Sequence, residues 1–225
     1  MKFSIIIPVL NEDAVIQSAL SPLQKMRNFG HEIIVVDGGS VDCTVEQAHP
    51  LADHVLIAEK GRSLQMNAGA ECASHEVLVF LHIDTEFNES HLDELQKLLK
   101  YTGKSWGRFN VRLSGVHWMF RIIEKLINWR SQFSGVATGD QVLFVRGNLF
   151  QTLGGFAEIP LMEDIEISKR LKLHESPLCI KRSVTTSSRR WEKNGIFRTI
   201  FLMWRLRLAY FLGVSPDVLV KRYYG

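Results

Sequence analysis

The sequence predicts a single α/β domain in which a mostly parallel sheet is covered by helices on both faces. Over the first hundred residues, continuous runs of Ile, Val and Leu alternate with segments of helical length, which is the pattern of parallel strands buried on both sides. The chain has 225 residues and a hydrophobic content of 46%, enough for one sizeable core. Its sequence contains no internal repeat, low-complexity tract or linker that would divide it.

The first half contains four predicted strands with helical segments between them. The strands are FSIIIPV, EIIVVD, HVLIA and EVLVFLH, at residues 3–9, 32–37, 54–58 and 76–82. Helices are expected over residues 12–27, 41–48, 62–74 and 89–100. In a doubly wound sheet, ligands bind beyond the carboxyl ends of the strands. The polar residues directly after each strand are therefore the first candidates for a binding site.

The second half shows a looser pattern of the same kind. Strands are expected at residues 107–113 and 141–147. An amphipathic helix lies between them, from about His117 to Gln132. A further helix is expected over residues 161–172, because its isoleucines and a leucine share one helical face.

The composition narrows the classes of function. A formal net charge of +3 is too small to predict a nucleic-acid partner. Cys43, Cys72 and Cys179 lie far apart without C-x-x-C spacing, so neither a disulfide framework nor a zinc site is expected, and we expect a cytoplasmic location. No apolar run reaches the roughly 18 residues of a membrane-spanning helix. Pro8 and the acidic residues after it argue against a signal peptide.

Two loops after predicted strands carry groups suited to a nucleotide or an anion. Asp37 ends a buried strand beside a flexible turn that contains Gly39, and its carboxylate can accept hydrogen bonds from a base or a ribose. Lys60 and Arg62 directly precede a helix, where two cations and the helix amides can face one anion. The alternatives are a plain turn at the first loop and a solvated basic loop at the second.

The stretch FLHIDT, residues 80–85, brings polar groups directly after a core strand. Asp84 offers the oxygen ligand that Mg²⁺ or Mn²⁺ prefers, while substrate phosphates and water supply the others. His82 is expected on the same side of an extended strand, as a second ligand or as a partner of one. The alternative is a hydrogen-bonded core histidine next to an exposed aspartate.

Glu163 and Asp164 place two adjacent carboxylates at the start of a predicted helix. Acidic residues favour helix N-termini for electrostatic reasons alone, so capping explains the pair without chemistry. In a site that already holds a metal and a nucleotide, a carboxylate here would deprotonate a hydroxyl. The turn Gly139-Asp140-Gln141 is a further candidate for substrate contact, with a simple turn before a strand as the alternative.

Six motifs in order carry a resemblance to a known family, and the resemblance covers nearly the whole chain, from residue 3 to about 220. They are SIIIPVLNE, EIIVVDGGSVD, LHIDT, GDQ, GGFAEIPLMEDIEISKRL and SSRRWEKNG. The chain resembles the GT-A type glycosyltransferases of family 2, and within them the small stand-alone bacterial-type subgroup. The resemblance implies a GT-A (Rossmann-like) fold and an inverting, metal-dependent enzyme of the hexosyltransferase type. Such an enzyme moves a sugar from a nucleotide-diphosphate sugar to an acceptor hydroxyl, and we favour a UDP-sugar.

The resemblance also implies roles for residues at matching positions. Asp37 matches the acid that contacts the base. Asp84 matches the final, metal-binding acid of the D-x-D motif, whose first acid is replaced here by His82. Asp164, the second acid of the Glu163–Asp164 pair, matches the family's catalytic base, which deprotonates the acceptor hydroxyl. The segment SSRRW (187–191) stands where the family has Q-x-x-R-W, and its missing glutamine argues against a processive polymerase. The expected catalytic residues are Asp164 and Glu163, and the expected metal ligands are Asp84 and His82.

The expected donor-binding set collects these positions and the loops around them. It comprises Pro8, Asn11, Glu12, Asp37, Gly39, Lys60, Arg62, Asn67, Asp84, Asp140, Arg190 and Trp191. Under the same resemblance the single domain divides into a nucleotide-binding half (1–100), an acceptor and catalytic half (101–194) and a helical tail (195–225).

The tail contains an apolar helical segment, GIFRTIFLMWRLRLAYFLGV, at residues 195–214. Its two faces are Phe197, Ile200, Phe201, Trp204, Leu208 and Phe211 on one side, and Leu202, Met203, Leu206 and Tyr210 on the other. Three interspersed arginines make it too polar to cross a bilayer, yet it is too apolar to stand alone in water. Three arrangements would cover its apolar faces: packing in the core, a homodimer interface, or peripheral contact with the inner face of a membrane. A lipid-linked acceptor would agree with membrane contact.

Two other functions stay open at this stage. A catalytically degenerate nucleotide-sugar-binding or membrane-associated scaffold is favoured by His82 and by the missing glutamine. Asp37, Asp84, Glu163 and Asp164 argue against it. A sugar nucleotidyltransferase would place a Gly-rich basic loop directly after the first strand, where this chain has PVLNEDAV.

Overall fold

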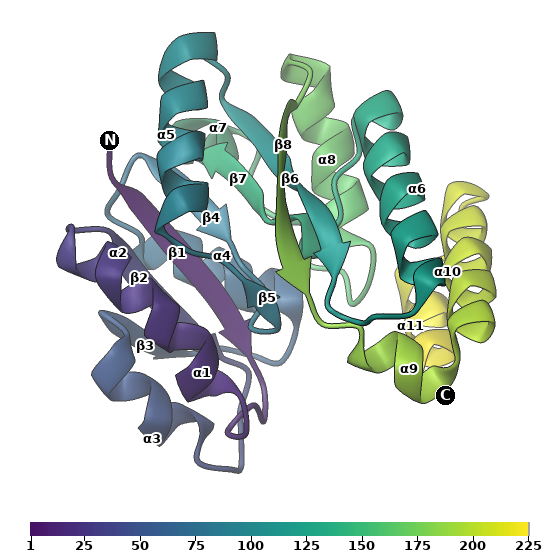
Figure 1. The fold of residues 1–225 in the computed structure, drawn as a ribbon, viewed down its shortest axis with the longest axis horizontal. Helices are drawn as coiled ribbons and strands as arrows, with labels where there is room; N and C mark the ends of the chain where they lie inside the picture. The colour runs from purple at the N-terminus through teal and green to yellow at the C-terminus, as the bar shows by residue number, and fades with distance from the viewer. Residues whose placement is uncertain (225) are drawn as a thin grey trace.

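The protein is built around one eight-stranded sheet with helices packed against both of its faces (Figure 1). The structure, a computed structural model, describes residues 1–224. Gly225, the last residue of the predicted tail, lies outside the described residues.

The strands and helices alternate through the first half and become less regular after residue 102. The strands are β1 (Phe3–Val9), β2 (Glu32–Asp37), β3 (His54–Ile57), β4 (Val77–Phe80), β5 (Thr85–Glu86), β6 (Trp106–Leu113), β7 (Leu143–Arg146) and β8 (Leu178–Thr186). The α-helices are α1 (Ile16–Leu20), α2 (Gln24–Asn28), α3 (Thr44–Ala48), α4 (Arg62–Cys72), α5 (Glu89–Thr102), α6 (Trp118–Ser134), α7 (Gly147–Thr152), α8 (Glu163–His174), α9 (Arg189–Asn194), α10 (Ile196–Phe211) and α11 (Pro216–Tyr224). Short 3₁₀ turns are η1 (Ser21–Leu23), η2 (His49–Leu51) and η3 (Gly139–Gln141).

The strand order is β3-β2-β1-β4-β7-β6-β8-β5. The neighbours β2–β3, β1–β2, β1–β4 and β6–β8 are parallel. Strand β7 runs antiparallel to both of its neighbours, and β5 runs antiparallel to β8. The predicted mostly parallel sheet with helices on both faces is confirmed.

Alternate residues of the central strands point into two separate cores. In β1, Ile5 and Ile7 join a core with α1, α2, α3 and α5, whereas Ile6 joins a second core with α4, α7 and α8. Every residue of β1 is buried. Burial on both faces explains why the strand is continuously apolar instead of alternating with polar residues.

Three segments differ from the sequence prediction. The helix expected over residues 12–27 is divided into α1, η1 and α2, with Pro22 in the first turn of η1. The strand expected to reach His82 ends at Phe80. Strand β8 was not expected, because three polar residues in its middle (181–183) are exposed and mask its apolar positions.

The sheet brings the candidate residues to one edge. Strands β1, β2 and β4 are parallel, so their carboxyl ends lie together. Strand β7 is antiparallel to β4 with Leu143 opposite Phe80, which places the start of β7 beside the end of β4. The turn η3, which precedes β7, therefore reaches the same edge.

Candidate active site

Asp37 organises the loop after β2. Its side chain is buried, and its Oδ2 accepts hydrogen bonds from the amides of Gly39 and Ser40, both at 2.8 Å. The hydroxyl of Ser40 donates to Oδ1 of Asp37 and accepts a 2.8 Å bond from the amide of Asn11. Gly39 has a φ of +91°, a left-handed conformation that favours glycine. Asp37 thus holds this turn, and its contact with a base stays a prediction.

The loops after β1 and β2 are joined by further polar contacts. The side-chain oxygen of Asn11 accepts a 2.9 Å bond from the amide of Val41, and the amide of Glu12 donates a 2.7 Å bond to Oγ1 of Thr44. These bonds fix the two loops as one rim at the carboxyl ends of the strands.

Gln65 supports this rim from below, and the sequence does not reveal it. The side chain is buried on α4 and donates from Nε2 to the carbonyl oxygens of Val9 at 2.8 Å and Val36 at 2.7 Å. It therefore joins the ends of β1 and β2 to α4. In a sequence, a glutamine inside a predicted helix is usually interpreted as solvent-exposed. The only sign of a buried role for Gln65 was its position on the side of the helix that faces the sheet.

The chain after β4 turns back instead of continuing as a strand. The amide of Thr85 donates a 3.0 Å bond to the carbonyl of His82. The expectation that His82 and Asp84 share one side of an extended strand is therefore wrong, because the strand has already ended. The carbonyl of Asp84 accepts a 3.1 Å bond from the amide of Ser187, which brings the start of the predicted SSRRW segment beside Asp84.

Gly139 lies between His82 and the pair Glu163–Asp164. The ring of His82 packs so closely on Gly139 that an added Cβ would lie 2.3 Å from its Cε1. On the other side, the amide of Gly139 donates a 3.0 Å bond to Oδ2 of Asp164, whose Oδ1 accepts a 2.7 Å bond from the amide of Ile165. His82, Gly139, Glu163 and Asp164 also line one small cavity. Residues far apart in sequence therefore meet here.

Two acids of this cluster have pKa values shifted in opposite directions. Burial, followed by the negative charge of Asp164, raises the pKa of Glu163, which is only 6% exposed. Desolvation acts to raise the pKa of Asp140, but the hydrogen bond and charge of His82, with the charge of Arg62, outweigh it and lower that pKa. The distance between Nδ1 of His82 and Oδ1 of Asp140 is 3.5 Å. Opposite shifts in neighbouring acids are a feature of acid–base sites.

Arg62 is the cation common to these acids. Its positive charge acts to lower the pKa of Glu12, Asp140 and Glu163. For Glu12, burial and the negative charge of Asp84 prevail and raise the pKa. Acids from three separate segments therefore lie within electrostatic range of one arginine, and Asp84 lies within such range of Glu12.

The predicted metal ligands fit a divalent ion unequally. Within residues 1–224, no group of three or more His, Cys, Asp or Glu could hold an ion. Mg²⁺ and Mn²⁺ commonly use one or two carboxylates while substrate phosphates complete the coordination, and Asp84 fits that role. His82 fits less well, because its Nδ1 faces Asp140 and its Cε1–Nε2 edge lies against Gly139. Asp84 is therefore the better placed of the two predicted ligands, and the ligand role of His82, which faces Asp140, stays a prediction.

Comparison with known proteins decides the family. The family model described as "Glycosyl transferase family 2" matches residues 4–150, which is more than half of the chain. The chain belongs to glycosyl transferase family 2. The family predicted from the six sequence motifs is therefore confirmed.

Curated relatives agree with this assignment. The PGL/p-HBAD biosynthesis glycosyltransferases of Mycobacterium bovis and Mycobacterium tuberculosis are 28% identical over 168 residues, covering 68% of this chain. The chain spans 62% of the length of these relatives.

Three of the similar structures span most of the chain. Mannosyltransferase PcManGT from Pyrobaculum calidifontis, solved with GDP-Man and Mn²⁺, has a TM-score of 0.68 at 18% identity and covers 98% of this chain and 64% of its own. TarS from S. aureus with UDP-GlcNAc has a TM-score of 0.67 at 20% identity, covering 83% and 58%. Glucosyl-3-phosphoglycerate synthase from Mycobacterium tuberculosis with Mg²⁺ and UDP has a TM-score of 0.65 at 17% identity, covering 95% and 79%. These likenesses confirm the predicted GT-A fold.

Some residues predicted for this family-2 chain have other structural partners. Both polar groups of the Asn67 side chain bond the backbone of Phe156, at 2.9 Å to its carbonyl oxygen and 2.9 Å from its amide. Pro8 lies within β1 opposite Val36, and Lys60 is exposed just before α4. The structure therefore gives Asn67 a packing role that the sequence did not predict.

The end of the SSRRW segment contacts the helical tail. Trp191 packs in an apolar cluster with Phe120 of α6 and Ile196 of α10. The guanidinium of Arg190 lies over the ring of Tyr223, with its central carbon 3.8 Å from the ring centroid. The predicted contacts of Arg190 and Trp191 with donor and acceptor stay predictions.

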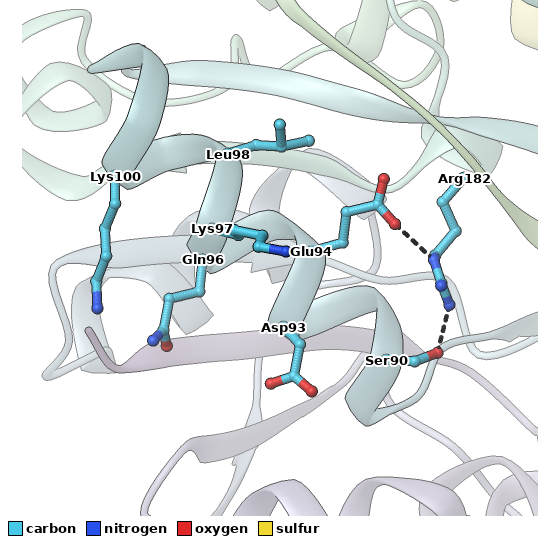
Figure 2. Close-up of a pocket in the computed structure, with 8 residues that line it drawn as sticks. All are labelled: Ser90, Asp93, Glu94, Gln96, Lys97, Leu98, Lys100 and Arg182. Carbon is cyan, nitrogen blue, oxygen red and sulfur yellow. Dashed lines mark hydrogen bonds and ion pairs between the residues drawn. The ribbon is translucent and has the colours of Figure 1, made fainter.

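A surface hollow of about 690 Å³ lies along α5 (Figure 2). Arg182 of β8 closes one end of it through a 2.6 Å bond to Glu94 and another of 2.6 Å to Ser90. The hollow is lined by Ser90, Asp93, Glu94, Gln96, Lys97, Leu98, Lys100 and Arg182. None of the predicted site residues is among them, so we do not assign the site to this hollow.

Proposed function

We propose that this family-2 chain is an inverting glycosyltransferase that moves a sugar from a nucleoside diphosphate sugar to an acceptor hydroxyl. Its curated relatives are named glycosyltransferases, and similar structures hold UDP, UDP-GlcNAc or GDP-Man. The observation that carries the proposal is the small cavity at which His82, Gly139, Glu163 and Asp164 meet, with Glu163 within electrostatic range of Arg62. A cation near these acids suits a substrate that carries a diphosphate next to a reacting hydroxyl.

The donor would bind along the rim formed by the loops after β1 and β2. The turn at Asp37 is already held rigid by three hydrogen bonds from Gly39 and Ser40, so little ordering would be required on binding. We favour UDP, because two of the similar structures contain UDP or UDP-GlcNAc. Arg62 would meet the diphosphate, since its guanidinium can bind phosphate oxygens in a bidentate manner.

Negative charge grows on the diphosphate as it leaves the sugar, and the site must stabilise that charge. Arg62 supplies one positive charge at this point. Mg²⁺ or Mn²⁺ held by Asp84 would act as a Lewis acid on the diphosphate oxygens. The pKa of Glu12 is raised by burial and by the charge of Asp84, and a cation bound at Asp84 would offset the second of these causes.

Asp164 is the proposed base. Its two oxygens accept amide hydrogen bonds from Gly139 at 3.0 Å and Ile165 at 2.7 Å, which fix its orientation. Each oxygen keeps a lone pair, so the carboxylate can take the proton of the acceptor hydroxyl as the hydroxyl oxygen attacks the sugar carbon. One base and a single displacement invert the configuration at that carbon.

The test separates binding from turnover. Thermal shift is measured with UDP and GDP, with and without Mn²⁺, and donor hydrolysis is followed by release of the nucleoside diphosphate. We expect one diphosphate to raise the Tm more strongly with Mn²⁺ and Asp84→Ala to abolish the metal effect. Asp164→Asn should keep the binding and slow turnover by about 10²- to 10⁴-fold.

Glu158→Gln is the matched control, because Glu158 is an exposed acid close to the start of α8. It should leave both binding and turnover unchanged. Binding of a diphosphate with no turnover in the wild-type chain would favour the degenerate scaffold. The absence of any shift with all nucleotides would end the proposal.

A further inference from the structure

Each of the helices α6 and α10 exposes one row of large apolar side chains. We call these rows together the aromatic face. It consists of Trp118, Ile122, Leu126, Trp129 and Phe133 on α6, and Phe197, Phe201, Trp204, Leu208 and Phe211 on α10. These side chains are between 46% and 85% exposed. Spacings of three and four residues place each row on one side of its helix.

The two helices are neighbours, so the rows belong to one part of the surface. Ile196 and Ile200 of α10 pack with Phe120 and Ile123 of α6 in one apolar cluster, and Figure 1 shows the two helices side by side. The face of α10 opposite the row packs inward, with Leu206 against Met162 and Ile165 at the start of α8. Core packing therefore satisfies only one side of α10.

Aromatic residues on this face are of the kind that occupies a membrane–water interface. Trp118, Trp129 and Trp204 are 65%, 67% and 69% exposed, whereas Trp106 is fully buried in the core. Tryptophan combines a large apolar ring with one polar N–H, which suits the headgroup region of a bilayer. Exposed apolar patches of this extent mark an interaction site in a soluble domain.

The charge of the tail complements an anionic surface. Residues 189–222 contain eight basic and two acidic side chains, a net charge of +6. Since the whole chain is +3, the remaining residues sum to −3. Helix α10 itself has three arginines and no acid, and Arg198 and Arg205 are exposed at the border of the apolar row.

A second copy of the chain fits this face less well. In a two-fold symmetric dimer the same patch meets itself, so exposed Arg198 and Arg205 would meet the aromatic face of the second copy, where α10 offers no acid to pair with them. Anionic lipid headgroups provide the missing negative charge. No helix within residues 1–224 is long and apolar enough to pass through a bilayer, so contact through these helices would be along the surface.

We propose that the aromatic face is a docking surface for an anionic lipid bilayer. The rings of α6 and α10 enter the headgroup region, and Arg198 and Arg205 of α10 contact lipid phosphates, as in other interfacial amphipathic helices. Docking in this way leaves the start of α8, with Glu163 and Asp164, about one helix diameter, ~10 Å, from the membrane surface. This inference does not depend on the proposed transfer reaction.

The experiment is vesicle flotation with the full chain, using vesicles of pure phosphatidylcholine and of phosphatidylcholine with 30 mol% phosphatidylglycerol. We expect binding to the anionic vesicles and at least a tenfold weaker binding to the neutral ones. The variant Phe201→Ser/Trp204→Ser should lose about tenfold in affinity, and so should Arg198→Gln/Arg205→Gln. Raising the salt to 0.5 M should weaken binding through the arginines.

The matched control is Tyr101→Ser on α5, because Tyr101 is 88% exposed and lies outside the aromatic face. It should bind vesicles as the wild type does. All these side chains are exposed, so an unchanged Tm should show that the variants are folded. If the wild-type chain does not bind the anionic vesicles, the proposal is wrong. A dimer that Phe201→Ser/Trp204→Ser dissociates, without vesicle binding, would assign the face to a second copy instead.

Discussion

The backbone amide of Gly139 donates a 3.0 Å hydrogen bond to Oδ2 of Asp164. This bond joins the turn η3 before β7 to the first turn of α8. The other side of Gly139 carries the ring of His82, which in turn faces Asp140. One residue without a side chain therefore sets the distance between the end of β4 and the proposed base.

Gly139→Ala should lower turnover strongly. The added Cβ would lie 2.3 Å from Cε1 of His82 and 2.5 Å from its Nε2, so the ring or the turn must move and Asp164 must move with it. A displacement of 1 Å in a catalytic group can reduce the rate by about 100-fold. The measurement is kcat/KM for donor turnover, with the Tm measured beside it.

Gly147→Ala provides the control, because a Cβ there would meet its nearest atom, the carbonyl oxygen of Glu76, at 3.6 Å. It should leave turnover unchanged. The double variant His82→Ala/Gly139→Ala removes the clash and should be more active than Gly139→Ala alone. If Gly139→Ala is as active as the wild type, the proposed coupling between η3 and Asp164 is wrong.

Glu163→Gln should stabilise the protein at neutral and alkaline pH. The pKa of Glu163 is raised by burial and by the charge of Asp164, so the folded chain holds this proton more tightly than the unfolded chain. Its stabilising effect is complete below the ordinary pKa of about 4.3 and is lost as the pH rises through the raised value. Glutamine stays neutral and avoids this loss.

The check is the Tm of Glu163→Gln and wild type from pH 4.5 to pH 8. We expect the difference to grow with pH and to approach zero at the acidic end. In a domain of this size each ~1 kcal/mol corresponds to about 2–4 °C. Glu158→Gln, which changes an exposed acid, should show no such pH trend. A constant difference at all pH values would contradict the assigned cause.

The places of several candidate residues could be predicted because these residues stand at the ends of predicted strands or at the start of a predicted helix. Asp37 ends β2, and Glu163 and Asp164 begin α8, as the sequence pattern indicated. The apolar strands were equally clear, since burial on both faces leaves continuous Ile and Val runs. The position of a residue after a strand predicts the edge of the sheet that it reaches.

The same pattern could not predict contacts that depend on the path of the chain between strands. The apolar run continues to Leu81, so the turn that redirects His82 toward Asp140 leaves no signal in it. The register between β8 and β6 shifts after Phe109. The shift interrupts the alternation of buried and exposed residues along β8. Gln65 was missed because its partners are backbone carbonyls, which every sequence has.

Gln65→Leu should destabilise the protein and loosen the donor rim. The change keeps the volume of the side chain but leaves the carbonyls of Val9 and Val36 without their bonds of 2.8 and 2.7 Å from Nε2. The carbonyl of Val9 keeps its 3.0 Å bond from the amide of Gly38, so the cost is that of the hydrogen bonds lost, about 0.5–1.5 kcal/mol each. Urea unfolding should show the loss, and the thermal shift with UDP should shrink. Gln151→Leu on α7 is the control, since Gln151 is exposed and should change neither value.

Two arginines with buried guanidinium nitrogens, Arg108 and Arg130, should respond in opposite ways to replacement by methionine. In Arg108, Nε donates to Oγ of Ser131 at 3.0 Å and Nη2 to the carbonyl of Asn128 at 3.2 Å. In Arg130, Nε and Nη2 are buried and have no hydrogen-bond partner within residues 1–224. Burial and the like charge of Arg207 lower the pKa of Arg130 to about 10.

Arg130→Met should raise the free energy of unfolding by about 1–3 kcal/mol, because an unpaired buried donor costs that much. Arg108→Met should lower it by a similar amount, because it removes bonds that are made. The unpaired nitrogens of Arg130 are costly, and its guanidinium is close enough to Asp164 for their charges to interact. Such a cost is expected to persist where function requires it. Arg130→Met should therefore also lower donor turnover. Urea unfolding and donor hydrolysis together decide this. If Arg130→Met is less stable than the wild type, Arg130 is an ordinary structural residue, and the link between its unpaired donors and the site is lost.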